Sequence, residues 1–157
     1  MDPGTFAWIS RSPIAAWVNS SGLIWPTLES IHFVSLCVLV GSLLIIDLRL
    51  IGFYRERCAP TVEALVRLSL LAFGVNFLTG ALFFAGNTPK YLNNSAFTLK
   101  LILIALAGLN AIYYRVRLSS LVDTNEVTRA SIGVGYLSLF LWTGVIICGR
   151  MITFYAR

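Results

Sequence analysis

The chain has 157 residues, of which 57% are hydrophobic and 12% are charged, and its formal net charge is +5. A soluble domain carries about 25% charged residues, so this composition and a mean hydropathy of +0.80 indicate a membrane protein and exclude a soluble globular class. The basic residues are dispersed and form no cluster, so we expect no nucleic-acid partner. At about 20 residues a span, the length limits the chain to about five crossings.

Residues 1–25 contain three tryptophans that are separated by polar residues. Tryptophan favours the headgroup level of a bilayer, and the segment is too interrupted by polar residues to cross one. We therefore expect a short amphipathic helix that lies flat at the membrane interface.

Four long apolar segments follow this N-terminal segment. We place the predicted spans at residues 26–53, 61–84, 96–114 and 127–154. Pro26 suits a first helical turn, where its missing N–H costs no hydrogen bond, and Asn94 or Ser95 can cap the third helix. The predicted fold is an all-α integral membrane four-helix bundle (26–157) preceded by the interfacial segment (1–25).

An even number of spans places both ends of the chain on the same side of the membrane. More Lys and Arg residues lie around the two loops on the opposite side than on the side of the termini. The positive-inside rule therefore predicts a multi-pass protein of a bacterial inner (plasma) membrane with both termini in the periplasm.

Four polar residues are expected in one layer at the side of the termini. His32, the only histidine, lies early in the first span, Lys100 lies early in the third, and Arg150 lies late in the fourth. Glu29 precedes His32 by three residues, and Asp47 follows farther along the same predicted stripe. Because charged groups are costly in lipid, we expect this stripe to face protein.

A lone histidine in a membrane helix has three uses that the sequence leaves open. It can ligate haem iron or another metal through a neutral ring nitrogen, it can relay protons, or it can hydrogen-bond to a neighbouring helix. With a single histidine in the chain, a second iron ligand would be water, a histidine of another protomer, or one of Lys100, Cys37 and Met151.

The other polar residues of the layer also have alternative roles. Lys100 and Arg150 can bind carboxylates, such as haem propionates or an acidic substrate, or can extend to lipid headgroups. Glu29 can orient His32 through its second ring nitrogen or can stabilise the helix dipole from a first turn.

Two polar residues lie deeper in the predicted spans. We expect Asp47 to form an ion pair with Arg49, or with Arg67 or Arg115 of another helix. We expect Asn76 to form a hydrogen bond across a helix contact. The sequence has none of the motifs of hydrolases, proteases or nucleotide-binding proteins.

Residues 29–53 and 74–114 together resemble an uncharacterised bacterial family of four-helix membrane proteins. More distantly, the layout is similar to HemJ-type protoporphyrinogen oxidases and CopD-type membrane proteins. The shared features are a first helix with His32, Gly41 and Arg49, and a third helix that opens with Phe97 and Lys100. In HemJ-type proteins the histidine is implicated in binding haem b and the lysine in activity. The resemblance therefore implies that His32 is an iron ligand and that Lys100 is a functional residue.

Together these observations predict a haem b-binding membrane protein with a redox or electron-transfer role, and an oxidoreductase activity is open. His32 is the candidate iron or metal ligand, Lys100 and Arg150 are candidate cofactor-binding residues, and Lys100 and Glu29 are candidate catalytic residues. A quinone or a porphyrin is the expected partner in the bilayer.

The alternative is a haem-free membrane subunit or a permease component for a small solute such as copper. In that case His32, Glu29 and Lys100 form a polar packing or entry layer. In either case we expect a homo-oligomer or a larger membrane complex, because four apolar helices leave much of their surface without a partner within the chain.

Overall fold

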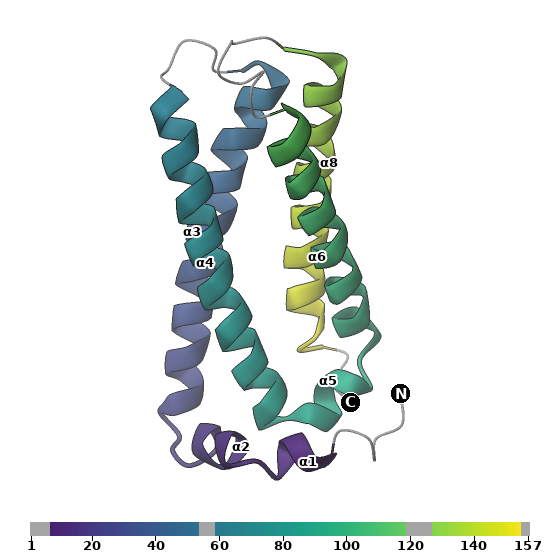
Figure 1. Cartoon of the computed structure of the whole chain (residues 1–157). Coiled ribbons are helices and arrows are strands. Elements are labelled where there is room, and N and C mark those ends of the chain that lie inside the picture. The colour runs from purple at the N-terminus through teal and green to yellow at the C-terminus, as the bar shows by residue number, and fades with distance from the viewer. Residues whose placement is uncertain (1–6, 54–58, 119–126, 155–157) are drawn as a thin grey trace.

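Four long helices stand side by side in the computed structural model, which describes residues 7–53, 59–118 and 127–154 (Figure 1). They are α3 (Ile24–Ile51), α4 (Ala59–Gly86), α6 (Ser95–Tyr113) and α8 (Arg129–Met151). A π-helical turn, η1 (Tyr114–Leu118), continues α6. All four long helices are long and apolar enough to cross a membrane, which confirms the prediction of an all-helical fold with four candidate spans.

The helix boundaries differ from the predicted ones by a few residues. α3 begins two residues before Pro26, which therefore lies inside the first turn. The side chain of Asn94 caps α6, since its oxygen accepts a hydrogen bond from the Ala96 N–H at 3.0 Å. One helix was not predicted: α5 (Thr88–Leu92) forms within the connection between α4 and α6, with Pro89 in its first turn.

The N-terminal segment contains two short helices instead of one. α1 (Ala7–Ser10) and α2 (Pro13–Val18) lie across one end of the bundle (Figure 1). Ser12 separates them, because its hydroxyl accepts a hydrogen bond from the Ala15 N–H at 3.2 Å and so caps α2. Ala15 and Val18 are buried, whereas Trp17 is about half exposed. The segment therefore has a protein-facing side and an exposed aromatic side.

Gly86, the last residue of α4, allows this segment to pack closely against the bundle. The Asn19 side-chain amide donates a hydrogen bond to the Gly86 carbonyl at 3.0 Å. A Cβ atom at Gly86 would lie 2.9 Å from Val18 Cγ1 and 2.9 Å from Trp25 Cζ3. Only glycine fits this contact without a shift of the neighbouring side chains.

A Gly86→Val substitution should lower the free energy of unfolding by about 1–3 kcal/mol, because the added side chain overpacks this contact. Gly74→Val is the matched control, since it introduces the same residue into α4 at a site where a Cβ meets nothing within 4 Å. Denaturant unfolding in detergent micelles measures both variants. Equal losses in the two variants would show that this contact does not explain the effect, since valine has a higher helix propensity than glycine and the exchange alone should cause no loss.

The long helices pack through small and polar residues that recur at intervals of three and four. The buried positions of α3 are Leu28, Ser35, Leu39, Ser42, Ile46, Asp47 and Leu50. Those of α8 include Ser131, Val134, Ser138, Leu141, Val145 and Cys148. This spacing is typical of left-handed helix pairs, and small residues allow membrane helices to approach closely.

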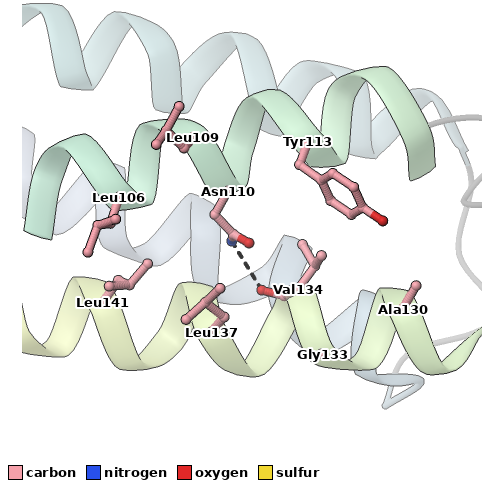
Figure 2. Close-up of a pocket in the computed structure, with 9 residues that line it drawn as sticks. All are labelled: Leu106, Leu109, Asn110, Tyr113, Ala130, Gly133, Val134, Leu137 and Leu141. Atoms are coloured by element: carbon pink, nitrogen blue, oxygen red, sulfur yellow. Dashed lines mark hydrogen bonds between the residues drawn. The ribbon is translucent and has the colours of Figure 1, made fainter.

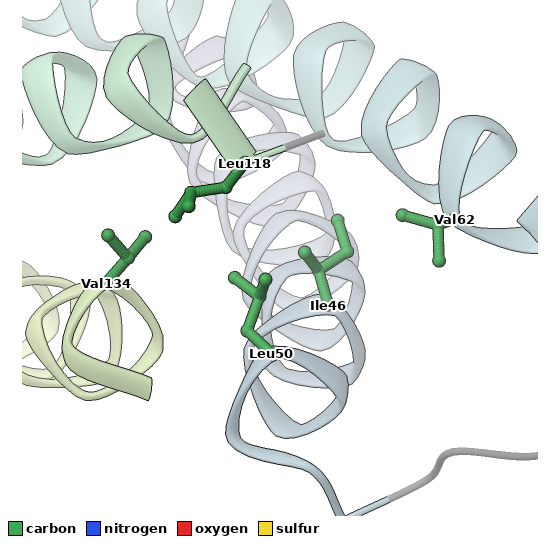
Figure 3. Packing of buried hydrophobic residues seen from close by; sticks show 5 residues of the cluster. All are labelled: Ile46, Leu50, Val62, Leu118 and Val134. Atoms are coloured by element: carbon green, nitrogen blue, oxygen red, sulfur yellow. The ribbon is translucent and has the colours of Figure 1, made fainter. Parts of the chain in front are cut away.

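Asn76 on α4 lies on this packing surface. Its side-chain amide donates to Ser35 Oγ of α3 at 2.7 Å, and Asn76 is buried. The predicted hydrogen bond across a helix contact is thereby confirmed. An apolar cluster of Ile46, Leu50, Val62, Leu118 and Val134 joins α3, α4, η1 and α8 near the end of the bundle remote from α2 (Figure 3).

The four helices form two pairs that share one central contact. α3 packs against α4 and α8, and α6 packs mainly against α8. Within α6 only Ala107 is buried. α4 and α6 approach each other through an aromatic contact near α5, where the rings of Phe84 and Phe97 stack with centroids 5.7 Å apart.

Candidate functional site

His32 is held between α3 and α4 by a short hydrogen bond. Its Nδ1 lies 2.7 Å from Thr79 Oγ1 in a partly buried position. The same Thr79 oxygen lies 2.8 Å from the Val75 carbonyl oxygen and 3.1 Å from that of Asn76. A threonine hydroxyl has a single proton, and within a helix it donates that proton to a preceding carbonyl. With the Thr79 proton directed to a carbonyl, Nδ1 is the donor to Thr79 and the lone pair of the ring lies on Nε2; with that proton directed to Nδ1, the ring carries its own proton on Nε2.

The imidazole ring is also constrained by its neighbours on α4. Phe83 meets it edge-on, with ring centroids 5.6 Å apart. A Cβ atom at Gly80 would lie 3.9 Å from His32 Cε1, so the ring rests against a residue without a side chain. Thr79, Gly80 and Phe83 therefore fix the position of the His32 ring.

Lys100 reaches the same layer from the other helix pair. Its ammonium lies near enough to His32 and to Cys148 for their charges to influence one another. The Nζ atom is 3.4 Å from the position that a Cβ would take at Gly149 of α8. Among the residues that the structure describes, this ammonium has neither an ion-pair partner nor a hydrogen-bond acceptor. The layer therefore holds a lysine near the His32 ring, with no counter-ion for it among the described residues.

Glu29 does not face the protein together with His32, so that expectation is wrong. Glu29 is exposed, and its Oε1 accepts a hydrogen bond from the Trp25 indole N–H at 3.0 Å. Glu29 and His32 are three residues apart, so their positions differ by about 60° around the axis of α3. This difference places Glu29 next to the buried positions of α3 but not among them. The residue that orients His32 is Thr79, and a catalytic role for Glu29 stays a prediction.

Tyr91 of α5 lies near Glu29, outside the four candidate spans. Its ring packs against Phe84 and Phe97, with centroids 6.3 and 5.2 Å away. Burial, together with the negative charge of Glu29, raises the pKa of the Tyr91 phenol above its ordinary value. Tyr91 therefore stays neutral at this end of the bundle.

Arg150 lies at the surface of α8, where its guanidinium carbon is 5.2 Å from the centroid of the Phe154 ring. Its role in cofactor binding stays a prediction. Of the other expected iron ligands, Cys37 and Met151 are both exposed. The cysteine near Lys100 is Cys148 instead.

Asp47 has a different partner from the Arg67 that the sequence offered. Asp47 is 4% exposed, and its carboxyl group lies close to the hydroxyl of Ser138 on α8. Arg67 instead pairs with Glu63 at 2.7 Å on the exposed side of α4. Asp47 therefore links α3 to α8.

The donor chemistry of the layer restricts the metals that it could hold. In the described part of the chain, no group of three or more His, Cys, Asp or Glu side chains could enclose a metal ion. A closed tetrahedral site of the structural zinc type needs four such ligands. An imidazole and a lysine ammonium are two of the groups that a haem site uses, one for the iron and one for a propionate, so haem at this layer stays a prediction.

The fold and the layer define a class: an all-helical protein with four helices long and apolar enough to span a membrane, and with a histidine–lysine layer near one end. Comparison with protein-family models, with curated proteins and with solved structures finds no match. Four residues of the layer were not predicted as part of the site, namely Thr79, Gly80, Phe83 and Gly149. Their only signal was that Thr79 lies one turn beyond Asn76 on the packing face of α4.

Proposed function

We propose that this chain is a multi-pass protein of the bacterial inner membrane, with both termini in the periplasm, and that it binds haem b through Nε2 of His32. Its role is redox or electron transfer with a quinone or porphyrin partner in the bilayer. The observation that carries the proposal is the 2.7 Å bond between His32 and Thr79. A ligating histidine is typically held in this way through its other ring nitrogen.

Each residue of the layer has a separate task in this proposal. Thr79 accepts the proton of Nδ1 and so keeps the Nε2 lone pair available, while Phe83 limits rotation of the ring. Lys100 would hold a carboxylate, because its ammonium is unpaired within the described residues and a carboxylate is its strongest partner. Haem, when bound, supplies reversible one-electron chemistry at its iron.

The second candidate function is a haem-free membrane subunit or permease component, in which the same layer serves packing or solute entry. It is supported by two polar bonds that join α3 to α4, His32–Thr79 and Asn76–Ser35. It is also supported by α6, because only 6% of the residues in its most apolar 18-residue window are buried within the chain. That exposed face would contact lipid, a second copy of the chain, or another subunit.

Absorption spectra of the detergent-purified protein, oxidised and dithionite-reduced, test the first function against the second. The wild type should show a Soret band and sharp reduced α and β bands. A Thr79→Val variant should retain haem but change its midpoint potential, because the tautomer and basicity of His32 are no longer fixed. Thr143→Val is the matched control, since Thr143 makes the same kind of bond to its own helix, to Leu139 at 2.7 Å, on an exposed face.

A colourless wild type, expressed with ample haem supply, would refute the haem proposal and favour the second function. A midpoint potential that is unchanged in Thr79→Val, or changed equally in Thr143→Val, would show that Thr79 does not position the ligand. Thr79 is thus a positioning residue whose effect is read from the potential and not from the amount of haem.

A further inference from the structure

A groove of about 490 Å³ opens between α6 and α8 (Figure 2), and it extends from the middle of these helices toward the end remote from α1 and α2 (Figure 1). Its walls are apolar and include Leu106, Leu109 and Leu137. These three leucines are 46%, 63% and 47% exposed, so the groove is open to whatever surrounds the span. Asn110 lies ten residues after Lys100, which is about 15 Å along α6, so this groove is separate from the His32 layer.

Two polar side chains of α6 line the groove one helical turn apart. The Asn110 amide donates to the Val134 carbonyl at 3.2 Å, which leaves its oxygen and a second N–H unused. The Tyr113 ring extends from α6 toward the start of α8 (Figure 2). Within the described part of the chain, the Tyr113 hydroxyl has no hydrogen-bond partner.

Unused polar groups in a membrane span require a partner, because the bilayer core offers no water to satisfy them. Asn110 and Tyr113 both lie within the candidate span Ser95–Leu118. Each can donate a hydrogen bond into the same groove. A ligand that accepts two hydrogen bonds and is otherwise apolar would satisfy both groups at once.

The charge of the side chains that line the groove indicates which kind of lipid headgroup it can bind. No charged side chain is among the residues that line the groove, so a phosphate headgroup finds no cation there. A neutral carbonyl headgroup matches the two donors, and an isoprenoid tail matches the leucine walls. The volume also falls within the range of about 300–1,000 Å³ that is usual for small-molecule sites.

We propose that the groove between α6 and α8 binds the headgroup of an isoprenoid quinone. Asn110 and Tyr113 donate hydrogen bonds to its carbonyl oxygens, and Leu106, Leu109 and Leu137 pack against its tail. Binding of the quinone in this groove does not require haem. A role of the groove in electron transfer rests on the proposed function.

Two glycines allow a sharp test of this site. A Cβ at Gly133, which lines the groove, meets nothing within 4 Å, and neither does a Cβ at Gly108 of α6, which is outside the lining. Gly133→Leu should therefore fill the groove without disturbing the helix packing. Gly108→Leu adds the same side chain to an exposed helical position and serves as the matched control.

The experiment is a titration of the full-length protein, in phosphatidylcholine nanodiscs, with a decyl-tailed benzoquinone. The wild type and Gly108→Leu should bind saturably with the same Kd. Gly133→Leu should raise the Kd at least tenfold, and Tyr113→Phe and Asn110→Leu should each raise it several-fold. Linear partitioning without saturation would overturn the proposal, as would equal Kd values for Gly133→Leu and Gly108→Leu.

The outcome also separates this site from the haem proposal. A colourless protein that binds the quinone in a Gly133-sensitive way supports the groove and refutes haem. A red protein without saturable binding supports haem and overturns the groove. A tightly co-purifying phospholipid that the quinone does not displace would likewise overturn the quinone assignment.

Discussion

Replacing Gly135 by leucine should separate α8 from α3 and lower the free energy of unfolding by about 3 kcal/mol or more, at the upper end of overpacking effects. A Cβ at Gly135 would lie 3.0 Å from the backbone oxygen of Asp47 and 3.0 Å from Ile51 Cγ1. A backbone oxygen cannot move aside without the whole of α3. The shift would also separate the side chains of Asp47 and Ser138, which are buried and lie close together between α3 and α8.

The matched control for this prediction is Gly133→Leu, two residues earlier on the same helix. Its Cβ meets nothing within 4 Å, and the change in helix propensity is the same, so the difference between the variants isolates the α3–α8 contact. We expect Gly133→Leu to lower the free energy of unfolding by no more than about 0.5 kcal/mol, because its site is open and leucine has a higher helix propensity than glycine. Denaturant unfolding in micelles, followed by circular dichroism, measures both. Comparable losses would show that α3 and α8 do not pack at Gly135.

A His32→Gly variant should purify without haem, and added imidazole should restore the reduced α band. The reasoning is that Thr79 positions His32 Nδ1 at 2.7 Å, so the substitution removes the ring that presents Nε2. Free imidazole can then occupy the space left by the side chain and hydrogen-bond to the same hydroxyl. Reduced-minus-oxidised spectra, recorded across an imidazole titration, measure the recovery.

Ser35→Gly is the control for this experiment. It removes the hydroxyl that Asn76 contacts at 2.7 Å, one turn from His32 on the same contact between α3 and α4, but it leaves the imidazole in place. We expect this variant to keep its haem. If Ser35→Gly also loses haem, the loss in His32→Gly reflects loosened packing, and if His32→Gly keeps its haem, the iron ligand is another residue.

The helices themselves were largely predictable because their signals are local. Apolar segments long enough to span a membrane predict the four helices. The cap of α6 is also local, because Asn94 accepts a hydrogen bond from the N–H of Ala96, only two residues later. Asn76 was also assigned correctly, since a polar side chain deep in a span needs a partner on another helix. The element that was not predicted is α5. It lies in a segment of turn-forming residues, and five of these residues form a short helix that contacts α4 and α6 at the end of the bundle.

The partners of the polar residues were less predictable. A small change of angle around a helix axis decides whether a side chain faces another helix or the outside of the bundle. Glu29 lies only about 60° from the position of His32 around α3, yet it is exposed while Leu28 is buried. Asp47 was expected to pair with Arg49, Arg67 or Arg115, but Arg67 pairs with Glu63, and Ser138 on α8 lies close to Asp47. Neither outcome can be read from spacing, because both depend on which helix lies opposite.

By itself, the sequence determined that this chain forms four helices of membrane-spanning length and that His32 and Lys100 lie at similar depth, since length, apolarity and helical rise are properties of the chain alone. Only the tertiary structure decided that Thr79 holds Nδ1 of His32, that Lys100 has no counter-ion within the described residues, and that a groove opens beside Asn110. The physical reason is that hydrogen bonds, close glycine contacts and grooves arise between helices, and the packing of small residues sets which helix faces meet.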